Sequence, residues 1–532
     1  MSQENEYIIR NVRIIDGTGR DMYEGSVRIA DGKFSFEKLN QDDVPVLDGK
    51  GLVMTPGFID SHSHADLCLG LDETKTLIGK ISQGVTTEVA GQCGFSLYPY
   101  KEEMREELRS CLGLFVDERI KAKLPQFATF AGFMQYATKE KKLFNYAFLV
   151  GHSVLRAAVM GHANRKPTAV ELEEMKSLLK DAMKHGAKGL SSGLVYIPGN
   201  YADADELIAL CKVIAPYGGV YATHMRNEAD DVTGAVTEAI HVAREAGVEL
   251  VISHHKICGK QNWGASEQTL ALIHAAGAEG VQVHYDIYPY HATMTTLDNC
   301  LPPKLFAEGT EALLSHLQEA EFRKMVRESM QEVPPQYDNP YLNAGGFGGV
   351  LISAASRTKD AIGKTIEAYA KEKNADPFDT LFDLLIANKL EIQATYFSLQ
   401  EEEMLKLYLD PHAVIGSDAI CSEQMTQTHP RAFGSLIRPL AEFALKRGII
   451  RLEDAVRKQT YETAKIWHLA RKGAILEGYD ADFVLLDIEK LEDTATFAHG
   501  ASLAKGVEAV YIAGRLVYTP AGITQVRAGE VL

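Results

Sequence analysis

The sequence predicts an α/β protein: a (β/α)8 TIM barrel with a small β-sandwich domain built from both termini. Two observations carry this prediction. Eight short apolar runs alternate with helical patterns through the middle of the 532-residue chain, and eight such alternations are typical of a barrel. Both ends of the chain instead carry short strands separated by turns. The composition, 46% hydrophobic and 24% charged, is ordinary for a globular protein.

The two ends of the chain are expected to pair with each other. Strand patterns occur before residue 56 and again after residue 472. We therefore expect residues 1–56 and 472–532 to form one small β domain. The expected strands are Tyr7–Ile15, Ser26–Ala30, Phe34–Lys38, Phe483–Asp487, Gly506–Ile512 and Arg515–Tyr518.

The barrel is expected over residues 57–471. Its strands should be buried on both faces, because most runs are nearly continuous in Val, Ile and Leu. Helices are expected between them, for example after Thr168, which has a capping-box spacing to Glu171, and over Val232–Glu245 and Ser266–Ala276. The expected strands are Gly57–His64, Val85–Gly94, Tyr146–His152, Gly186–Leu194, Val220–Met225, Leu250–His255, Val281–Tyr288 and Ala413–Asp418.

One stretch, residues 291–411, is too long for a plain β/α connection. We expect it to contain extra helices, such as Pro377–Asn388, and to form an inserted lid over the substrate. The glycines in Gly345–Gly349 indicate flexibility. They do not indicate a dinucleotide site, because no Rossmann unit surrounds them.

Charge and cysteine content exclude several classes of protein. The net charge of −17 argues against a nucleic-acid partner. No apolar run approaches the roughly 20 residues that a membrane span needs, and the N-terminus has no secretory pattern. The seven cysteines are scattered and odd in number, which favours a reducing cytoplasm over a disulfide framework. The sequence does not indicate an oligomeric state.

Six metal-binding side chains follow five of the expected strands. Their residue types, imidazole, thiolate and carboxylate, are those that bind zinc. The C-terminal ends of barrel strands carry active sites, so we expect these side chains to converge. A single buried histidine is more often structural, but six such residues at one end of the barrel favour a metal centre. They are His62, His64, Cys93, His224, His254 and Asp418.

Individual positions refine this expectation. His62 and His64 are two residues apart, so on a strand both can face one ion. His255 follows His254 directly, so it should face away and be structural. Asp418, at the end of the eighth strand, is well placed as the general base that takes a proton from water and returns it to the leaving nitrogen. Its alternative role is a turn or helix cap.

These residues resemble the amidohydrolase superfamily and, within it, the N-acyl-D-amino-acid deacylases, also called D-aminoacylases. The resemblance covers nearly the whole chain. Further matching segments are Leu149–Arg156, Gly189–Gly199, Tyr288-Pro-Tyr290, His429-Pro-Arg431 and Arg471–Asp482. The resemblance implies one tight zinc held by Cys93, His224 and His254. It also implies a second, weaker site at His62, His64 and Asp418, with Cys93 shared. Lys188 lies at the wrong end of its strand to act as the bridging lysine of related cyclic amidohydrolases.

The resemblance also implies a substrate, an N-acyl-D-amino acid whose amide is hydrolysed. Lys256, Tyr288 and Arg431 would hold its α-carboxylate, and Tyr196 would line the pocket. Ammonium, phenol and guanidinium groups suit that role. The alternatives are a D-dipeptidase, a cyclic amidase of the hydantoinase or dihydroorotase type, and an inactive metal-binding relative. The preferred D-side chain and acyl group are not indicated.

Overall fold

A computed structural model describes residues 6–39, 44–113, 116–139, 142–307, 309–420, 423 and 429–532. Its centre is a set of parallel strands that follow one another in chain order, as the sequence predicts, and the arrangement matches a TIM barrel. The strands are β6 (Phe58–Asp60), β7 (Val85–Ala90), β8 (Asn145–Phe148) with β9 (Val150–Gly151), β10 (Gly189–Gly193), β11 (Val220–His224), β12 (Glu249–Ile252), β13 (Val283–Ile287) and β17 (Ala413–Ile415).

The ring of strands closes between β17 and β6. The backbone N–H of Asp418 donates to the carbonyl of His62 at 2.9 Å, and Ser63 forms a parallel bridge with Ala419. These contacts lie just beyond the C-terminal ends of both strands. The first and last strands therefore bring their following residues together, which places the two histidines of the His-x-His pair beside Asp418.

The expected helices are present. Helix α7 (Ala169–Lys184) begins with the predicted capping box between Thr168 and Glu171. Helices α9 (Val232–Ala246) and α10 (Ser266–Ala278) match the other two predictions within two residues. Along α9, the buried positions Ala235, Val236, Ala239, Ile240 and Ala243 recur at helical spacing, so one apolar face packs inward.

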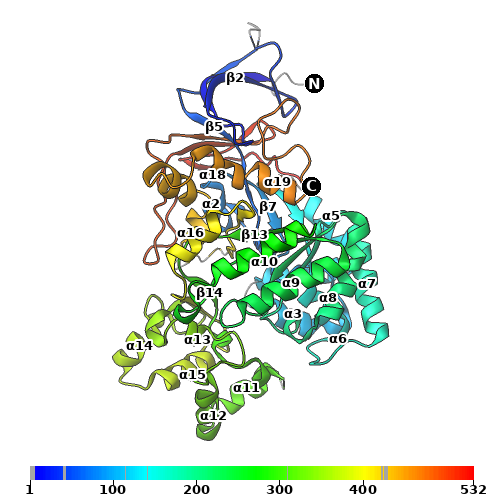
Figure 1. Ribbon diagram of the computed structural model, residues 1–532, viewed down its shortest axis with the longest axis vertical. Helices are drawn as coiled ribbons and strands as arrows, with labels where there is room; N and C mark the ends of the chain where they lie inside the picture. Colours follow the sequence, from blue (N-terminus) through cyan, green and yellow to red (C-terminus); the bar gives the residue numbers. More distant parts are fainter. Residues whose placement is uncertain are drawn as a thin grey trace.

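The strands of the two chain ends share one sheet. Its order is β21-β20-β19-β18-β5-β1-β2-β3, with β4 beside β1, and the antiparallel pair β18–β5 joins the two ends of the chain. The sheet lies at one end of the molecule (Figure 1). The strands are β1 (Tyr7–Ile14), β2 (Tyr23–Ala30), β3 (Lys33–Ser35), β4 (Val46–Asp48), β5 (Val53–Pro56), β18 (Phe483–Leu486), β19 (Val507–Ile512), β20 (Arg515–Thr519) and β21 (Gly522–Ile523).

The long segment after β13 projects from the opposite end of the molecule (Figure 1). It has a hydrophobic core of its own, which includes Leu317, Val326, Leu381 and Leu385. The predicted helix is confirmed as α15 (Pro377–Ala387). A three-stranded antiparallel sheet was not predicted: β14 (Thr293–Thr296), β16 (Ile392–Tyr396) and β15 (Val350–Ala355). The other helices of this long segment are α11 (Thr310–His316), α12 (Ala320–Met330), α13 (Pro340–Asn343) and α14 (Ile366–Lys373).

The glycine-rich segment 345–349 has a defined turn conformation. Gly345 and Gly346 have φ angles of 72° and 103°, a left-handed region that glycine enters readily, and Phe347–Gly349 form a 3-10 helix. At the end of the inserted segment, α16 (Glu401–Leu409) leads back into β17. Among the described residues, no helix has the length and apolarity to cross a membrane.

Candidate metal centre

The thiol of Cys93 lies among three histidines. Its Sγ atom is 3.2 Å from Nε2 of His62, 3.4 Å from Nε2 of His254 and 3.8 Å from Nδ1 of His224. Zinc–sulfur and zinc–nitrogen bonds near 2.3 and 2.0 Å separate tetrahedral donors by about 3.5 Å. The donor set therefore has the residue types and the spacing that a zinc ion requires. The sequence expectation that these strand ends converge is met.

The backbone at three of these positions is left-handed. The φ angles are 53° at Cys93, 38° at His254 and 49° at Asp418. Such angles are uncommon for residues other than glycine and mark turns or functional sites. Each residue stands just after its strand, so the turn redirects the side chain inward across the mouth of the barrel.

His62 and His64 meet Asp418 on the other side of the thiol. Oδ1 of Asp418 lies 3.5 Å from Nε2 of His62 and 3.3 Å from Nε2 of His64. The strand β6 ends at Asp60, so both histidines lie beyond it. Strand alternation therefore does not align them, and that part of the expectation was wrong. The two rings do lie together, with their centroids 5.4 Å apart.

Protonation states favour metal binding by two of these histidines. Burial holds the pKa values of His224 and His254 well below their ordinary value, so both imidazoles are neutral, the form that binds a metal. Burial also raises the pKa of the Cys93 thiol. Burial alone would raise the pKa of Asp418, but the Arg431 guanidinium and nearby histidines hold it well below the ordinary range. Asp418 is thus a carboxylate.

Two buried carboxylates that sequence reasoning missed hold the histidines in place. Glu228 lies 3.0 Å from Nδ1 of His254. Asp286 lies 3.3 Å from Nδ1 of His62 and accepts the backbone N–H of His254 at 2.8 Å. A carboxylate on the second ring nitrogen fixes the orientation of a metal-binding histidine. Asp286 had a signal in the sequence, because it is an acidic residue inside the expected strand Val281–Tyr288.

The proposed carboxylate-binding residues are close to the same centre. Lys256 Nζ lies 2.6 Å from Glu228 and 2.6 Å from Nδ1 of His254. Arg431 donates to Oδ2 of Asp418 at 2.6 Å. Both cations approach the ring of Tyr288, at 5.7 and 4.9 Å from its centroid. The structure thus brings the three together, but Lys256 and Arg431 also bind acidic residues of the centre.

Of the remaining residues considered from the sequence, one lies at the site and two lie away from it. Tyr196 packs edge-on against His224, with ring centroids 5.0 Å apart, so it lines the pocket. His255 points away, with Nε2 3.0 Å from the Thr269 hydroxyl of α10, which confirms its structural assignment. Lys188 is at the opposite end of the barrel, where its backbone N–H donates to the Phe148 carbonyl before β10 begins.

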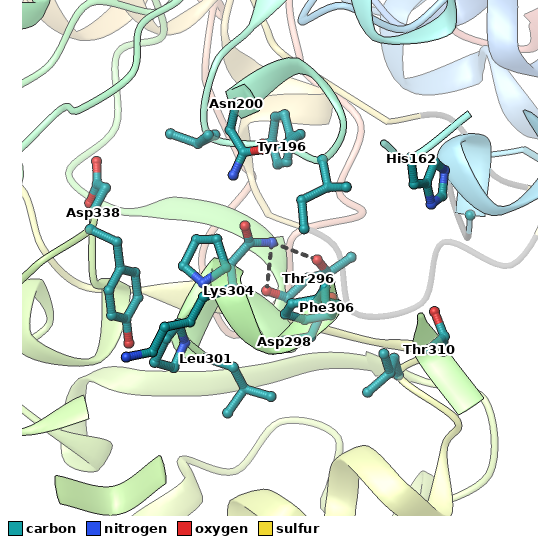
Figure 2. A pocket seen from close by; sticks show the side chains of 18 of the residues that line it. His162, Tyr196, Asn200, Thr296, Asp298, Leu301, Lys304, Phe306, Thr310 and Asp338 are labelled. Carbon is teal, nitrogen blue, oxygen red and sulfur yellow. Dashed lines mark hydrogen bonds between the residues drawn. The ribbon is translucent and has the colours of Figure 1, made fainter. Parts of the chain in front are cut away.

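A small pocket of about 70 Å³ opens between these groups, lined by Tyr196, His224, Lys256, Tyr288, Asp418 and Arg431. It adjoins a larger cavity of about 890 Å³ between the barrel and the inserted segment, and the two share the lining residues Val195, Tyr196, Asn299 and Asp338. Figure 2 shows Tyr196 and Asn200 on the barrel side of this cavity, facing Thr296, Lys304 and Phe306 of the insertion. The metal-binding groups are therefore reached beside a cavity large enough for a small molecule.

Comparison with known proteins shows the family of this chain. The chain matches the model of the Amidohydrolase family over residues 45–518. The chain therefore belongs to the amidohydrolase family. It is 34% identical to a D-aminoacylase of Alcaligenes xylosoxydans xylosoxydans over 486 residues, which are 91% of this chain and 88% of that protein.

Two solved structures are similar over 99% of both chains. One is a D-aminoacylase studied for its binuclear metal center, with a TM-score of 0.81 and 32% sequence identity. The other is an N-acyl-D-glutamate deacylase of Bordetella bronchiseptica in complex with zinc and a phosphonate inhibitor, with a TM-score of 0.82 and 29% identity. The similarity thus extends through the terminal sheet, the barrel and the inserted segment.

Proposed function

We propose that this chain is a zinc-dependent deacylase that hydrolyses the amide bond of N-acyl-D-amino acids to a carboxylate and a free D-amino acid. One observation carries the proposal. Three histidines surround the Cys93 thiol, and two of them, His224 and His254, line a pocket in which two buried cations flank Tyr288. The first feature suits a hydrolytic metal and the second suits a carboxylate-bearing substrate. The activities of the similar proteins support the choice of D-amino acids.

The tight zinc would be held by Cys93, His224 and His254. His62, His64 and Asp418, together with Cys93, would hold a second, weaker ion, and the binuclear centre of the similar D-aminoacylase supports the presence of two ions. Zinc in such a site polarises the acyl carbonyl and makes water a nucleophile at neutral pH.

Asp418 would move the proton. Its carboxylate is ionised and close to the candidate metal ligands, so it can accept a proton from the attacking water. The water oxygen adds to the acyl carbon, the C–N bond breaks, and the proton passes from Asp418 to the departing nitrogen. Arg431, bound to the other oxygen of Asp418, would fix the orientation of this carboxylate.

Lys256, Tyr288 and Arg431 would bind the α-carboxylate of the substrate. The three groups are buried, so their charge-assisted hydrogen bonds are stronger than they would be in water. With the carboxylate fixed there and the amide at the metal, only one enantiomer directs its side chain away from the pocket wall. The same cations attract an anion into a chain whose net charge is −17.

A D-dipeptidase is the second candidate, and the large cavity favours it. The pocket at the metal is only about 70 Å³, whereas the adjoining cavity is about 890 Å³. An acyl group that extends past Tyr196 into this cavity can be as large as an aminoacyl group.

In the proposed domain organisation, the inserted segment around 291–411 would act as a lid over the barrel of 57–471. Residues 1–56 and 472–532 would form the small β-sandwich.

A panel of substrates tests the proposal. We expect the zinc-loaded protein to hydrolyse N-acetyl-D-amino acids and to leave the matching L-enantiomers nearly untouched. Removal of zinc by a chelator should abolish the activity, and added zinc should restore it. D-dipeptides in the same panel decide the second candidate. A preference for L-substrates or for hydantoins would overturn the assignment.

A further inference from the structure

A second cluster of metal-binding side chains lies at the opposite end of the barrel from Cys93. It consists of His274, Asp410 and His412, each of which offers one ligand atom within 4.8 Å of the others. His412 immediately precedes β17 at its N-terminal end, and the neighbouring strand β13 begins at Val283. The active-site residues follow the C-terminal ends of the same strands. The two clusters are therefore separated by the length of the barrel.

The hydrogen bonds of His412 leave one of its ring nitrogens available to bind a metal. Nδ1 of His412 lies 2.8 Å from the carbonyl of Val283. A carbonyl only accepts, so Nδ1 carries the proton and Nε2 keeps the lone pair that a metal needs. Binding of the second ring nitrogen to a backbone carbonyl is the usual arrangement in metal-ligating histidines. His412 is therefore held in the tautomer that a metal requires.

His274 and Asp410 complete the set. Nε2 of His274 lies 2.6 Å from Oδ2 of Asp410, while Oδ1 of the same carboxylate accepts the backbone N–H of His412 at 2.9 Å. The ring centroids of His274 and His412 are 5.3 Å apart, close to the 5.4 Å between His62 and His64. The carboxylate is thus aimed at the first imidazole and fixed by the backbone of the second.

Accessibility and neighbours also suit a metal ion. The His274 side chain is 50% exposed and that of Asp410 is 6% exposed, so the cluster is open to solvent on one side. A third imidazole, His284 on β13, lies 6.0 Å from the His412 ring, and its buried Nδ1 has no hydrogen-bond partner among the described residues. Lys458 binds the carbonyls of Asp410 and Ala413, not the carboxylate. It therefore does not occupy either carboxylate oxygen, although its charge weakens the site.

We propose that His274, Asp410 and His412 form a structural site for a divalent transition metal such as zinc, separate from the Cys93 centre. Two imidazoles and one carboxylate are typical zinc ligands, and imidazole also suits copper and nickel. The ligands come from α10 and from the connection between α16 and β17, and the two helices pack together (Figure 1). A bound ion would join two successive β/α units and hold the strand that leads to Asp418.

Zinc titration of the metal-stripped protein tests this site without reference to catalysis. Zinc binding is measured by competition with a chromogenic chelator and by elemental analysis. We expect the double variant H274A/H412A to bind one zinc equivalent fewer than the wild type and to keep full activity once the Cys93 site is loaded. In a C93A background, H274A/H412A should remove the remaining tight binding. His316, an exposed histidine paired with Glu319 at 3.2 Å, supplies the matched control H316A.

The outcome separates the two sites. Equal zinc stoichiometry and affinity in the wild type and H274A/H412A would overturn the proposal, and so would a C93A variant that binds no zinc. The variant H412Q keeps a polar side chain before β17. It guards against misfolding and should also lose the site. Failure of the proposed deacylase activity would leave the zinc-binding measurements unchanged, because no substrate enters them.

Discussion

Replacing Lys256 with Met removes an ammonium group that binds both Glu228 and His254. The side chains of Lys256 and Glu228 are 7% and 8% exposed, and removal of one partner of a buried ion pair costs about 3–5 kcal/mol of stability. Loss of a charge-assisted contact to the substrate carboxylate costs about 1.5–3 kcal/mol. That corresponds to about 10- to 150-fold in kcat/KM. The variant thus combines a folding effect with a binding effect.

A second substitution separates the two effects. In the double variant K256M/E228Q, no unpaired carboxylate remains, so we expect most of the thermal stability to return. Recognition of the substrate carboxylate should not return. The assay compares kcat/KM for an N-acetyl-D-amino acid and for its α-carboxamide, with Tm and zinc content measured beside them.

The two substrates should respond differently. Relative to the single variant E228Q, which already carries the effect of Glu228 on His254, we expect the free acid to lose about 10- to 150-fold in the double variant. The carboxamide should change little between these two variants, since it has no carboxylate to bind. Equal losses on both substrates, at unchanged zinc content, would refute a role for Lys256 in carboxylate binding. Lys256 would then act on the metal centre through His254.

Other substitutions test the metal centre. Cys93→Ala should lose the zinc of the Cys93 centre and nearly all turnover, whereas the buried Cys211 of α8 (Ala204–Ile214) can be replaced by Ala without either loss; zinc content in C93A equal to that of the wild type would make Cys93 a core thiol. Asp418→Asn should keep the Cys93-centred zinc but lose at least roughly 10²-fold in kcat; surviving activity would move the proton transfer elsewhere. Asp286→Asn should weaken zinc affinity about 10- to 100-fold, because Asp286 orients His62 and accepts the backbone N–H of His254; chelator competition measures it, and unchanged affinity would make Asp286 only a strand residue.

The barrel strands were predictable because burial on both faces leaves a strong signal. A parallel strand covered by helices needs an apolar run, and the polar residue that ends each run falls at the mouth of the barrel. The order of the strands then follows from the order of the runs. For this reason the sequence alone predicts that His62, Cys93, His224 and His254 lie together.

Other parts of the molecule lacked such a signal. Strand β14 reads Thr-Met-Thr-Thr, and its sheet depends on pairing with β16, about a hundred residues away. Glu228 follows His224 in a loop, where an acidic residue is ordinary. Its burial arises only when Lys256 and His254 arrive from the next strand. Long-range contacts of this kind decide the role of a residue, and no local pattern reports them.

The left-handed backbone at Cys93, His254 and Asp418 has a consequence for the metal-free chain. Each such residue costs about 1–3 kcal/mol, and the cost is concentrated on the turns that follow three barrel strands. A bound ion offsets this cost by joining the side chains. Without the ion, these turns should open locally while the barrel stays folded. Amide hydrogen exchange should therefore be faster at these three strand ends in metal-stripped protein, and zinc would stabilise the turns without being needed to fold the barrel.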